Sequence, residues 1–376
     1  MGSTRGVGGA KRAGDGSPRR VLVLYTELAP YVLACLNALV DRHNVEVHLV
    51  RWPLNREAPF ELDFHPRMKV YARNELSDRE LAEMAVRVKP HLVLASGWLD
   101  KGYLGVCRAM RARRVPTVMT FDTAWRGGFK QWLSAVAARF WMSRTFSHAW
   151  ATGSKQAEYA KRLGFAPDRI RTGFYAADTA PFIAANERKR EAQQAIPHRL
   201  VCVARYIPTK GQQVLCDAFA RLCADGKASD WELWLLGTGE LHEQVKNSTS
   251  GKHPRIQHKG FVQSADMPVL LGQCGASVLP SLYEPWGVAV QEHACAGLPL
   301  LLSDAVGAGE RFLREGENGF VHRAGDVDDL CRSLAAIIAL PDDHLVLMSE
   351  RSAELGRAWQ PKDWADVAAD LLQERA

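Results

Sequence analysis

Short apolar runs alternate with amphipathic helical patterns along the first half of the chain. Apolar runs of strand length occur at Val21–Tyr25, Val45–Val50, Leu92–Ser96, Thr117–Phe121 and Ala149–Thr152. Uninterrupted apolar runs of this length are typical of strands that are buried on both faces of a parallel sheet. Helical patterns separate these runs; the segment after the capping-box pattern Ser77–Glu80 is one of them, and Pro90 must end it. The series predicts a βαβ domain with a parallel sheet covered by helices.

The alternation is interrupted once and then resumes. Residues 186–198 are polar and charged and contain Pro197, a composition that predicts a linker between domains. Apolar runs return at Leu200–Ala204, Glu232–Leu236, Arg255–His258, Ala276–Leu279 and Pro299–Leu302. The sequence therefore predicts two doubly wound α/β domains. A ligand cleft is expected between them, outside the carboxyl ends of the strands.

This pattern divides the 376 residues into five parts. We expect a disordered tail over 1–19, an N-terminal domain over 20–185, a linker over 186–198, a C-terminal domain over 199–357 and an amphipathic terminal helix within 358–376. The tail is Gly-rich and basic and lacks the apolar core of a signal peptide. Each domain is long enough to bury its own core.

Composition narrows the class of protein. Charged residues make up 24% and hydrophobic residues 47%, an ordinary globular profile. A net charge of +6 is too small to indicate a nucleic-acid partner, and no apolar run reaches the length of a transmembrane helix. The eight cysteines form no CxxC pair and mostly lie inside apolar runs. They predict free thiols in a reducing compartment, and hence a cytoplasmic location.

Basic residues concentrate in one part of the chain. Between positions 101 and 171, Lys and Arg greatly outnumber the acids, which are Asp122, Glu158 and Asp168. Such a region suits an anionic membrane surface or an acidic acceptor, or it simply solvates helix faces. Within it, residues 129–144 interleave aromatic and basic side chains. We expect these aromatics to pack into the core. The alternative is a helix that makes peripheral contact with the inner face of an anionic membrane.

The most informative segment runs from Tyr283 to Pro299. Glu284 lies in a loop after a strand, and Glu292 lies eight positions later in the following helix. Gly287 lets the backbone approach a ligand, and Val288 leads into a helix N-terminus, whose N–H groups suit a diphosphate. Glu284 suits sugar hydroxyls, and Glu292 suits both hydroxyls of a ribose, because a carboxylate accepts two donors at once. The alternative, two ordinary surface acids, leaves the unusual loop unexplained.

Two further loops lie at the ends of predicted strands. Arg205 and Lys210 follow the run 200–204, where two cations neutralise a departing diphosphate. Gly239 closes a Gly-x-Gly pattern after the run 232–236, which fits close approach to a phosphate or a plain turn. The full GxGxxG pattern is missing, which argues against an ordinary NAD-binding domain.

Together these motifs resemble the retaining glycosyltransferases of family 4, which have the GT-B fold. The resemblance is strong over about 201–326 and mostly topological over 20–182. It implies that Glu284 contacts the donor sugar and Glu292 the ribose, and that Arg205 and Lys210 bind the donor diphosphate. It also implies that the terminal helix crosses back to the N-terminal domain. The activity implied is transfer of a sugar from a nucleotide-diphosphate sugar, with UDP or GDP, to a glycan or lipid-linked acceptor in bacterial polysaccharide assembly.

The N-terminal half departs from the family pattern in two places. The loop 26–31 contains no glycine, whereas many members have a Gly-rich loop there. Phe121 stands where many members carry a histidine, and Asp122 follows it. Asp122 is therefore our candidate for the polar group on the acceptor side, with a loop-capping aspartate as the alternative.

No metal site is predicted. Asp326-Val327-Asp328 matches the DxD metal pattern formally, but Asp326 with Asp329 fits a helix N-cap better. The donor is expected to be the one small molecule required, without a metal or other cofactor. Three alternatives remain open: a nucleotide-sugar epimerase or a phosphorylase with the same fold, and a catalytically inactive scaffold that binds a glycan.

Overall fold

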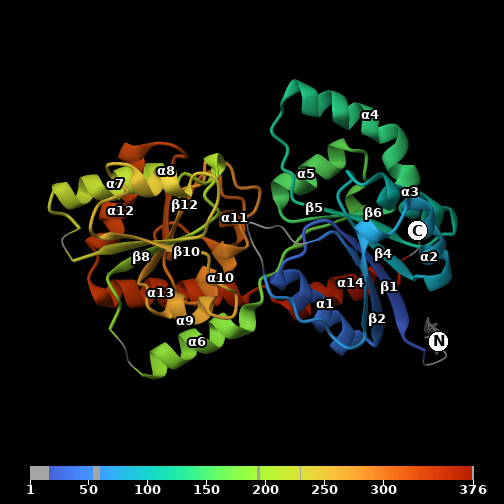
Figure 1. The fold of residues 1–376 in the computed structure, drawn as a ribbon, viewed down its shortest axis with the longest axis horizontal. Coiled ribbons are helices and arrows are strands. Elements are labelled where there is room, and N and C mark those ends of the chain that lie inside the picture. Colours follow the sequence, from blue (N-terminus) through green and yellow to red (C-terminus); the bar gives the residue numbers. More distant parts are fainter. Residues whose placement is uncertain (1–16, 54–59, 193–194, 229, 375–376) are drawn as a thin grey trace, which may run out of the picture.

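The computed structural model describes residues 17–53, 60–192, 195–228 and 230–374. Two α/β domains lie side by side in it (Figure 1). Each domain has one sheet whose strands all pair in parallel, with helices on both faces. The predicted pair of doubly wound domains is confirmed.

The N-terminal sheet has the strand order β3-β2-β1-β4-β5-β6-β7. Helices α1 and α14 cover one face, while α2, α3, α4 and α5 cover the other. Its strands are β1 (Arg19–Tyr25), β2 (Val45–Arg51), β3 (Met68–Ala72), β4 (Leu92–Ser96), β5 (Thr117–Phe121), β6 (His148–Ala151) and β7 (Ile170–Arg171). Its helices are α1 (Pro30–His43), α2 (Asp78–Val88), α3 (Lys101–Ala112), α4 (Phe129–Thr145), α5 (Ser154–Arg162) and, from the end of the chain, α14 (Pro361–Leu371).

The C-terminal sheet has the order β10-β9-β8-β11-β12-β13. Its strands are β8 (Arg199–Val203), β9 (Glu232–Leu236), β10 (Ile256–Gly260), β11 (Ala276–Leu279), β12 (Leu300–Ser303) and β13 (Gly319–His322). Its helices are α6 (Thr179–Glu191), α7 (Gln212–Ala224), α8 (His242–Asn247), α9 (Met267–Gly272), α10 (Ala289–Cys295), α11 (Gly309–Phe312), α12 (Val327–Ile338) and α13 (Asp342–Arg357).

Strand order reverses at one point in each sheet. In the N-terminal sheet this point lies between β1 and β4, and in the C-terminal sheet between β8 and β11. The loops that leave the two central strands turn to opposite sides there, which opens a crevice at the carboxyl ends. The two crevices face each other across the domain boundary, so the fold itself creates the cleft that the sequence predicts.

The chain crosses between the domains twice, once between β7 and α6 and once between α13 and α14. The first crossing corrects the expected linker at 186–198. Helix α6 continues to Glu191 and packs against α9, α10 and α13 of the C-terminal domain. The last turns of α6 contain Arg188-Lys189-Arg190, and this run of charges made the segment resemble a linker. The expected tail begins outside the described residues, and Arg19 already belongs to β1.

Helix α4 corrects a second expectation. Ala135, Ala138, Met142 and Thr145 form its buried side. A second apolar stripe, on the opposite side, is exposed: Phe129, Trp132, Leu133, Val136 and Phe140. Phe129, Trp132 and Phe140 therefore do not pack into the core, contrary to the prediction, because the small residues of the other stripe fill that position; Trp141 does pack against the core.

Local signals at two helix starts are confirmed. Ser77 and Glu80 form the reciprocal capping box at the start of α2. The side chain of Asp326 accepts a hydrogen bond from the backbone of Asp329 at 2.9 Å, so the DxD pattern is an N-cap. In the described part of the chain, every helix falls short of the length and apolarity needed to span a bilayer.

Candidate functional site

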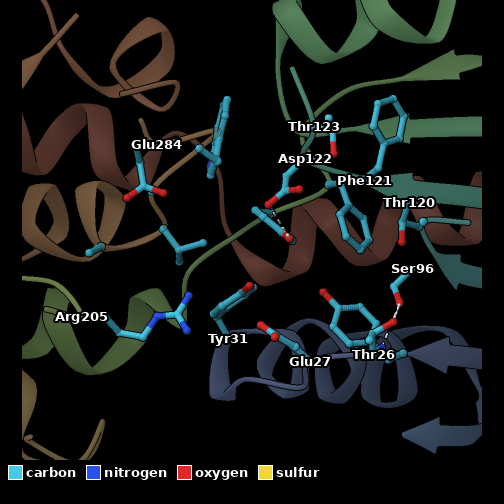
Figure 2. A pocket seen from close by; sticks show the side chains of 18 of the residues that line it. Thr26, Glu27, Tyr31, Ser96, Thr120, Phe121, Asp122, Thr123, Arg205 and Glu284 are labelled. Atoms are coloured by element: carbon cyan, nitrogen blue, oxygen red, sulfur yellow. Dashed lines mark hydrogen bonds between the residues drawn. The ribbon is translucent and has the colours of Figure 1, made fainter. Parts of the chain in front are cut away.

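A cleft of about 660 Å³ lies between the domains at the carboxyl ends of β1, β4, β5, β8 and β11. Figure 2 shows Glu284 and Arg205 on the C-terminal wall, facing Tyr31, Glu27 and Asp122 on the N-terminal wall. Residues from both halves of the chain therefore meet in one cavity.

Lys210 and Glu284 form a half-buried ion pair on the C-terminal wall. The loops that carry them are joined by their backbones: the N–H of Leu282 donates to the carbonyl of Thr209 at 2.8 Å. Gly211, at φ 69°, fixes the end of the Lys210 loop, where a Cβ atom would lie 2.3 Å from the carbonyl oxygen of Pro280. The cation and the carboxylate are thus held together by the fold before any ligand arrives.

Arg205 extends from the end of β8 toward the cleft (Figure 2) and lines both this cavity and the smaller one beside it. For Gly239 the sequence left open a phosphate contact or a plain turn. This glycine adopts φ 149° and lies against the backbone of Tyr206, whose carbonyl oxygen would be 2.6 Å from a Cβ atom. Gly239 therefore supports the Arg205 loop and is not part of the lining given by Gly237 and Thr238.

Gly287 lines the cleft in the loop between Glu284 and the start of α10, with φ 95°. A Cβ atom there would lie 3.0 Å from Cγ of Glu284. A side chain would therefore displace the carboxylate as well as strain the backbone. Val288 follows and lines both cavities, as predicted for the start of the helix.

Glu292 lines a smaller, mainly apolar cavity of about 240 Å³ that adjoins the main cleft. Phe60 and Phe261 both line this cavity, and their ring centroids are 5.6 Å apart. Burial, together with the nearby charge of Asp178, raises the pKa of Glu292 to about 7. The two predicted carboxylates therefore serve two adjoining cavities.

Asp122 follows β5 on the N-terminal wall. Its Oδ2 accepts a hydrogen bond from the hydroxyl of Tyr175 at 3.4 Å. Burial raises its pKa, and the charges of Glu284 and Glu27 raise it further. The structure brings Asp122 into the same cleft as Glu284, as expected for an acceptor-side group.

Several lining residues carried no signal in the sequence. Thr26 and Ser96 share a hydrogen bond of 2.7 Å between their hydroxyls at the ends of β1 and β4 (Figure 2). Tyr31 packs edge-on against Tyr175, with ring centroids 5.3 Å apart. Tyr175 follows β7, a strand of two residues, so no apolar run marks its position.

Two family models cover most of the chain. Residues 184–355 match the model "Glycosyl transferases group 1", and residues 22–172 match "Glycosyl transferase 4-like domain". Together the two matches place the chain among the GT-B glycosyltransferases. The domain limits of the models fall on either side of the first crossing between β7 and α6.

Relatives of this glycosyltransferase include the phosphatidyl-myo-inositol mannosyltransferase of Mycobacterium leprae, 27% identical over 281 residues, or 70% of this chain and 68% of that protein. LpsE, a lipopolysaccharide core biosynthesis glycosyltransferase of Rhizobium meliloti, is 27% identical over 163 residues. That match covers 43% of this chain and 45% of LpsE.

Solved structures share the fold over nearly the whole glycosyltransferase. HepE of Anabaena, in complex with UDP and glucose, aligns with a TM-score of 0.70 at 18% identity, covering 94% of this chain and 99% of HepE. A glycosyltransferase of Rickettsia africae aligns with a TM-score of 0.73 at 12% identity, covering 95% and 98%. At these identities the likeness establishes the fold.

Proposed function

We propose that this glycosyltransferase moves a sugar from a nucleotide-diphosphate sugar, with UDP or GDP, to a hydroxyl of a glycan or lipid-linked acceptor. We further propose that the anomeric configuration is retained and that no metal is needed. The Lys210–Glu284 pair beside Arg205, opposite Asp122, is the observation that carries this proposal. It combines fixed positive charge for a leaving diphosphate with carboxylates for sugar hydroxyls.

Each of the two cavities is proposed to bind a different part of the donor. The apolar one suits a nucleobase, and Glu292 at its wall suits the two ribose hydroxyls. Arg205 lines both cavities, which suits the diphosphate between ribose and sugar. Glu284 then contacts the donor sugar in the larger cavity. The UDP in the HepE complex supports a nucleotide in this fold.

The acceptor hydroxyl is proposed to enter from the N-terminal wall near Asp122. The bond between the anomeric carbon and the donor phosphate oxygen breaks, and the acceptor oxygen bonds to that carbon on the same face. The acceptor proton passes to the leaving phosphate oxygen. Arg205 and Lys210 stabilise the negative charge left on the nucleoside diphosphate. Asp122 is proposed to orient the acceptor through its carboxyl group, whose pKa is raised by burial.

The setting is proposed to be bacterial polysaccharide or glycolipid assembly in the cytoplasm. The names of the mannosyltransferase and of LpsE support this class of acceptor.

Glu284→Gln tests the central role. We expect the rate of transfer to fall by about 10²–10³-fold, because one preorganised charged contact to the reacting sugar is lost. Nucleotide affinity, measured by calorimetry with UDP and GDP and without metal, should change little. The exposed Glu240→Gln serves as the control.

Wild-type rates in Glu284→Gln would contradict the proposal. Free sugar epimerised without an acceptor would identify an epimerase, and nucleotide or glycan binding without turnover in the wild type would identify a scaffold.

Peripheral contact with an anionic membrane is proposed for α4, at the top of the N-terminal domain in Figure 1. Its exposed apolar stripe is flanked by Lys130, Arg139 and Arg144, and the helix contains no acidic residue. An apolar stripe with basic flanks suits the boundary between headgroups and acyl chains.

Vesicle sedimentation tests this contact. Vesicles with phosphatidylglycerol should bind the protein, vesicles of phosphatidylcholine alone should bind it less, and salt should weaken the binding. The double variant Trp132→Ser/Phe140→Ser should bind at least about tenfold more weakly. The exposed Leu347→Ser on α13 is the control. Equal binding by the double variant and the control would exclude α4 as the contact.

A further inference from the structure

The two domains touch beside the cleft at the N-terminus of α5. A Cβ atom at Gly153 would lie 2.3 Å from Oε1 of Glu310 and 2.5 Å from Cζ3 of Trp286, so the C-terminal domain fills the space next to this glycine. The N–H of Ser154 donates to Oε1 of Glu310 at 2.8 Å, and its hydroxyl bonds to the same carboxylate. The start of α5 is therefore docked on the C-terminal domain.

Gln156, in the first turn of α5, joins the two walls of the site directly. Its Nε2 donates to the carbonyl oxygen of Asp122 at 2.9 Å and to the carbonyl oxygen of Pro285 at 2.7 Å. The first belongs to the N-terminal wall, and the second to the residue that follows Glu284. The side chain is 1% exposed, so water does not compete for these bonds.

We propose that Gln156 is a positioning residue that sets the separation between Asp122 and Glu284 when the domains close. The inference rests on the proposed sugar transfer. A primary amide has two N–H donors on one nitrogen, which matches the two carbonyl acceptors. A carboxylate of the same length has none, and asparagine is shorter by one methylene group.

One bond of Gln156 stays within the N-terminal domain, at the Asp122 loop, and the other crosses to Pro285 of the C-terminal domain. The apolar contacts of α5 with its own domain come from Tyr159 and Ala160. Arg205, Lys210, Glu284 and Glu292 all lie on the C-terminal domain. Removing the amide should therefore leave donor binding intact. The Asp122 side of the cleft, however, should no longer be held at a fixed separation from Glu284, so the reacting groups are misplaced and the rate falls.

Gln156→Met tests this separation of roles, because methionine keeps the length of the side chain and lacks both donors. We expect kcat to fall about 10- to 100-fold, with the nucleotide Kd, measured by calorimetry, within about twofold of the wild-type value. The exposed Gln244→Met on α8 is the matched control.

Gln156→Glu adds a pH-dependent readout. In this variant an ionised carboxylate would face two carbonyl oxygens. The kcat of the variant relative to that of the wild type should therefore be lowest at high pH. Protonation supplies one O–H donor, and the ratio to wild type should rise as the pH falls.

Small-angle scattering tests domain closure without relying on turnover. Gln156→Met should have a larger radius of gyration than the wild type, with or without UDP. Failure of the proposed function, meaning no transfer by the wild type, leaves this comparison intact. Wild-type kcat in Gln156→Met would overturn the positioning role. So would an unchanged radius of gyration, or a nucleotide affinity that falls in step with kcat.

Discussion

Glu292 combines burial with a place on the wall of a binding cavity. Its carboxyl has a pKa of about 7 because it is removed from water and lies near Asp178. In an unfolded chain the same group would titrate near its ordinary value of about 4.3. Between these two values the folded state holds a proton that the unfolded state has lost. Folding is therefore favoured below this range, and the contribution is lost as the pH rises through about 7.

The predicted consequence is a change in stability with pH that depends on one residue. Glu292→Gln should raise the free energy of unfolding at pH 8 by about 3–4 kcal/mol relative to wild type, because the cost of a buried charge disappears. At pH 4 the two proteins should be equally stable. Urea unfolding at the two pH values measures this difference. Equal stability at pH 8 would show that the carboxylate is well solvated, and Glu240→Gln is the exposed control.

At the scale of single residues, the sequence predicted those site residues whose chemical type and spacing together form a recognisable motif. Glu284, Arg205 and Lys210 line the cavities because each lies in a loop after a recognisable strand, and Glu292 lines one because it lies on the helix that follows such a loop. The role of Gly239 stayed open because a glycine at φ 149° that packs against a neighbouring backbone cannot be distinguished by sequence from one that contacts a phosphate. The partners of Gln156 lie 34 and 129 positions away. Only the folded chain brings them together.

Helices α10 and α13 show how closely elements pack behind the site. Gly356, near the end of α13, faces α10, where a Cβ atom would lie 2.6 Å from the backbone nitrogen of Cys295. Gln291, on the same helix as Glu292, donates to the carbonyl oxygen of Gly356 at 3.1 Å. The absence of a side chain at Gly356 therefore lets α13 pack closely against α10, the helix that carries Glu292, the candidate for binding the ribose.

Gly356→Ala should lower the free energy of unfolding by about 1–3 kcal/mol, because the added methyl group forces the helices apart. Gly105→Ala is the matched control, since a Cβ atom on α3 meets nothing within 4 Å. It should raise the free energy of unfolding by about 0.5–1 kcal/mol through helix propensity. Denaturant unfolding distinguishes the two, and a neutral Gly356→Ala would mean that α10 moves easily.

Helices and strands were predicted well where the pattern of apolar residues shows clearly which faces are buried. The central strands match the predicted runs to within about two residues, since both their faces are buried. The exposed stripe of α4 and the charged turn of α6 were misassigned for opposite reasons. In α4, two apolar stripes hide which one is buried, and in α6 the Arg-Lys-Arg run hides a helix that is buried at Phe182.

At the scale of the whole molecule, the N-terminal domain is completed by the end of the chain. Trp364 of α14 stacks on Trp150 at a centroid distance of 4.7 Å and donates to the carbonyl oxygen of Phe174 at 2.7 Å. Arg19 of β1 donates to the carbonyl oxygen of Leu372 at 2.7 Å. The crossing of the terminal helix, which the family resemblance implied, is thus part of the core and not a surface attachment.

Trp364→Ala should therefore destabilise the N-terminal domain by about 3–5 kcal/mol, because it leaves a cavity against β6 and removes a buried hydrogen bond. Calorimetry should resolve an earlier transition for that domain, with the transition of the C-terminal domain unchanged. The exposed Trp132→Ala should change stability by about 0.5 kcal/mol or less. A single transition that shifts as a whole would mean that the two domains unfold together.

Helix α14 is synthesised after the rest of the N-terminal domain, and this order affects folding during translation. Translation adds about 5–20 residues per second, and domains usually fold in the order in which they leave the ribosome. Here the C-terminal domain is one continuous segment, from α6 to α13, whereas the N-terminal sheet, although synthesised first, must wait for the last helix. The nascent chain therefore exposes the apolar face between α1 and β6 until α14 has been synthesised, and we expect this domain to need more protection by chaperones than the C-terminal one.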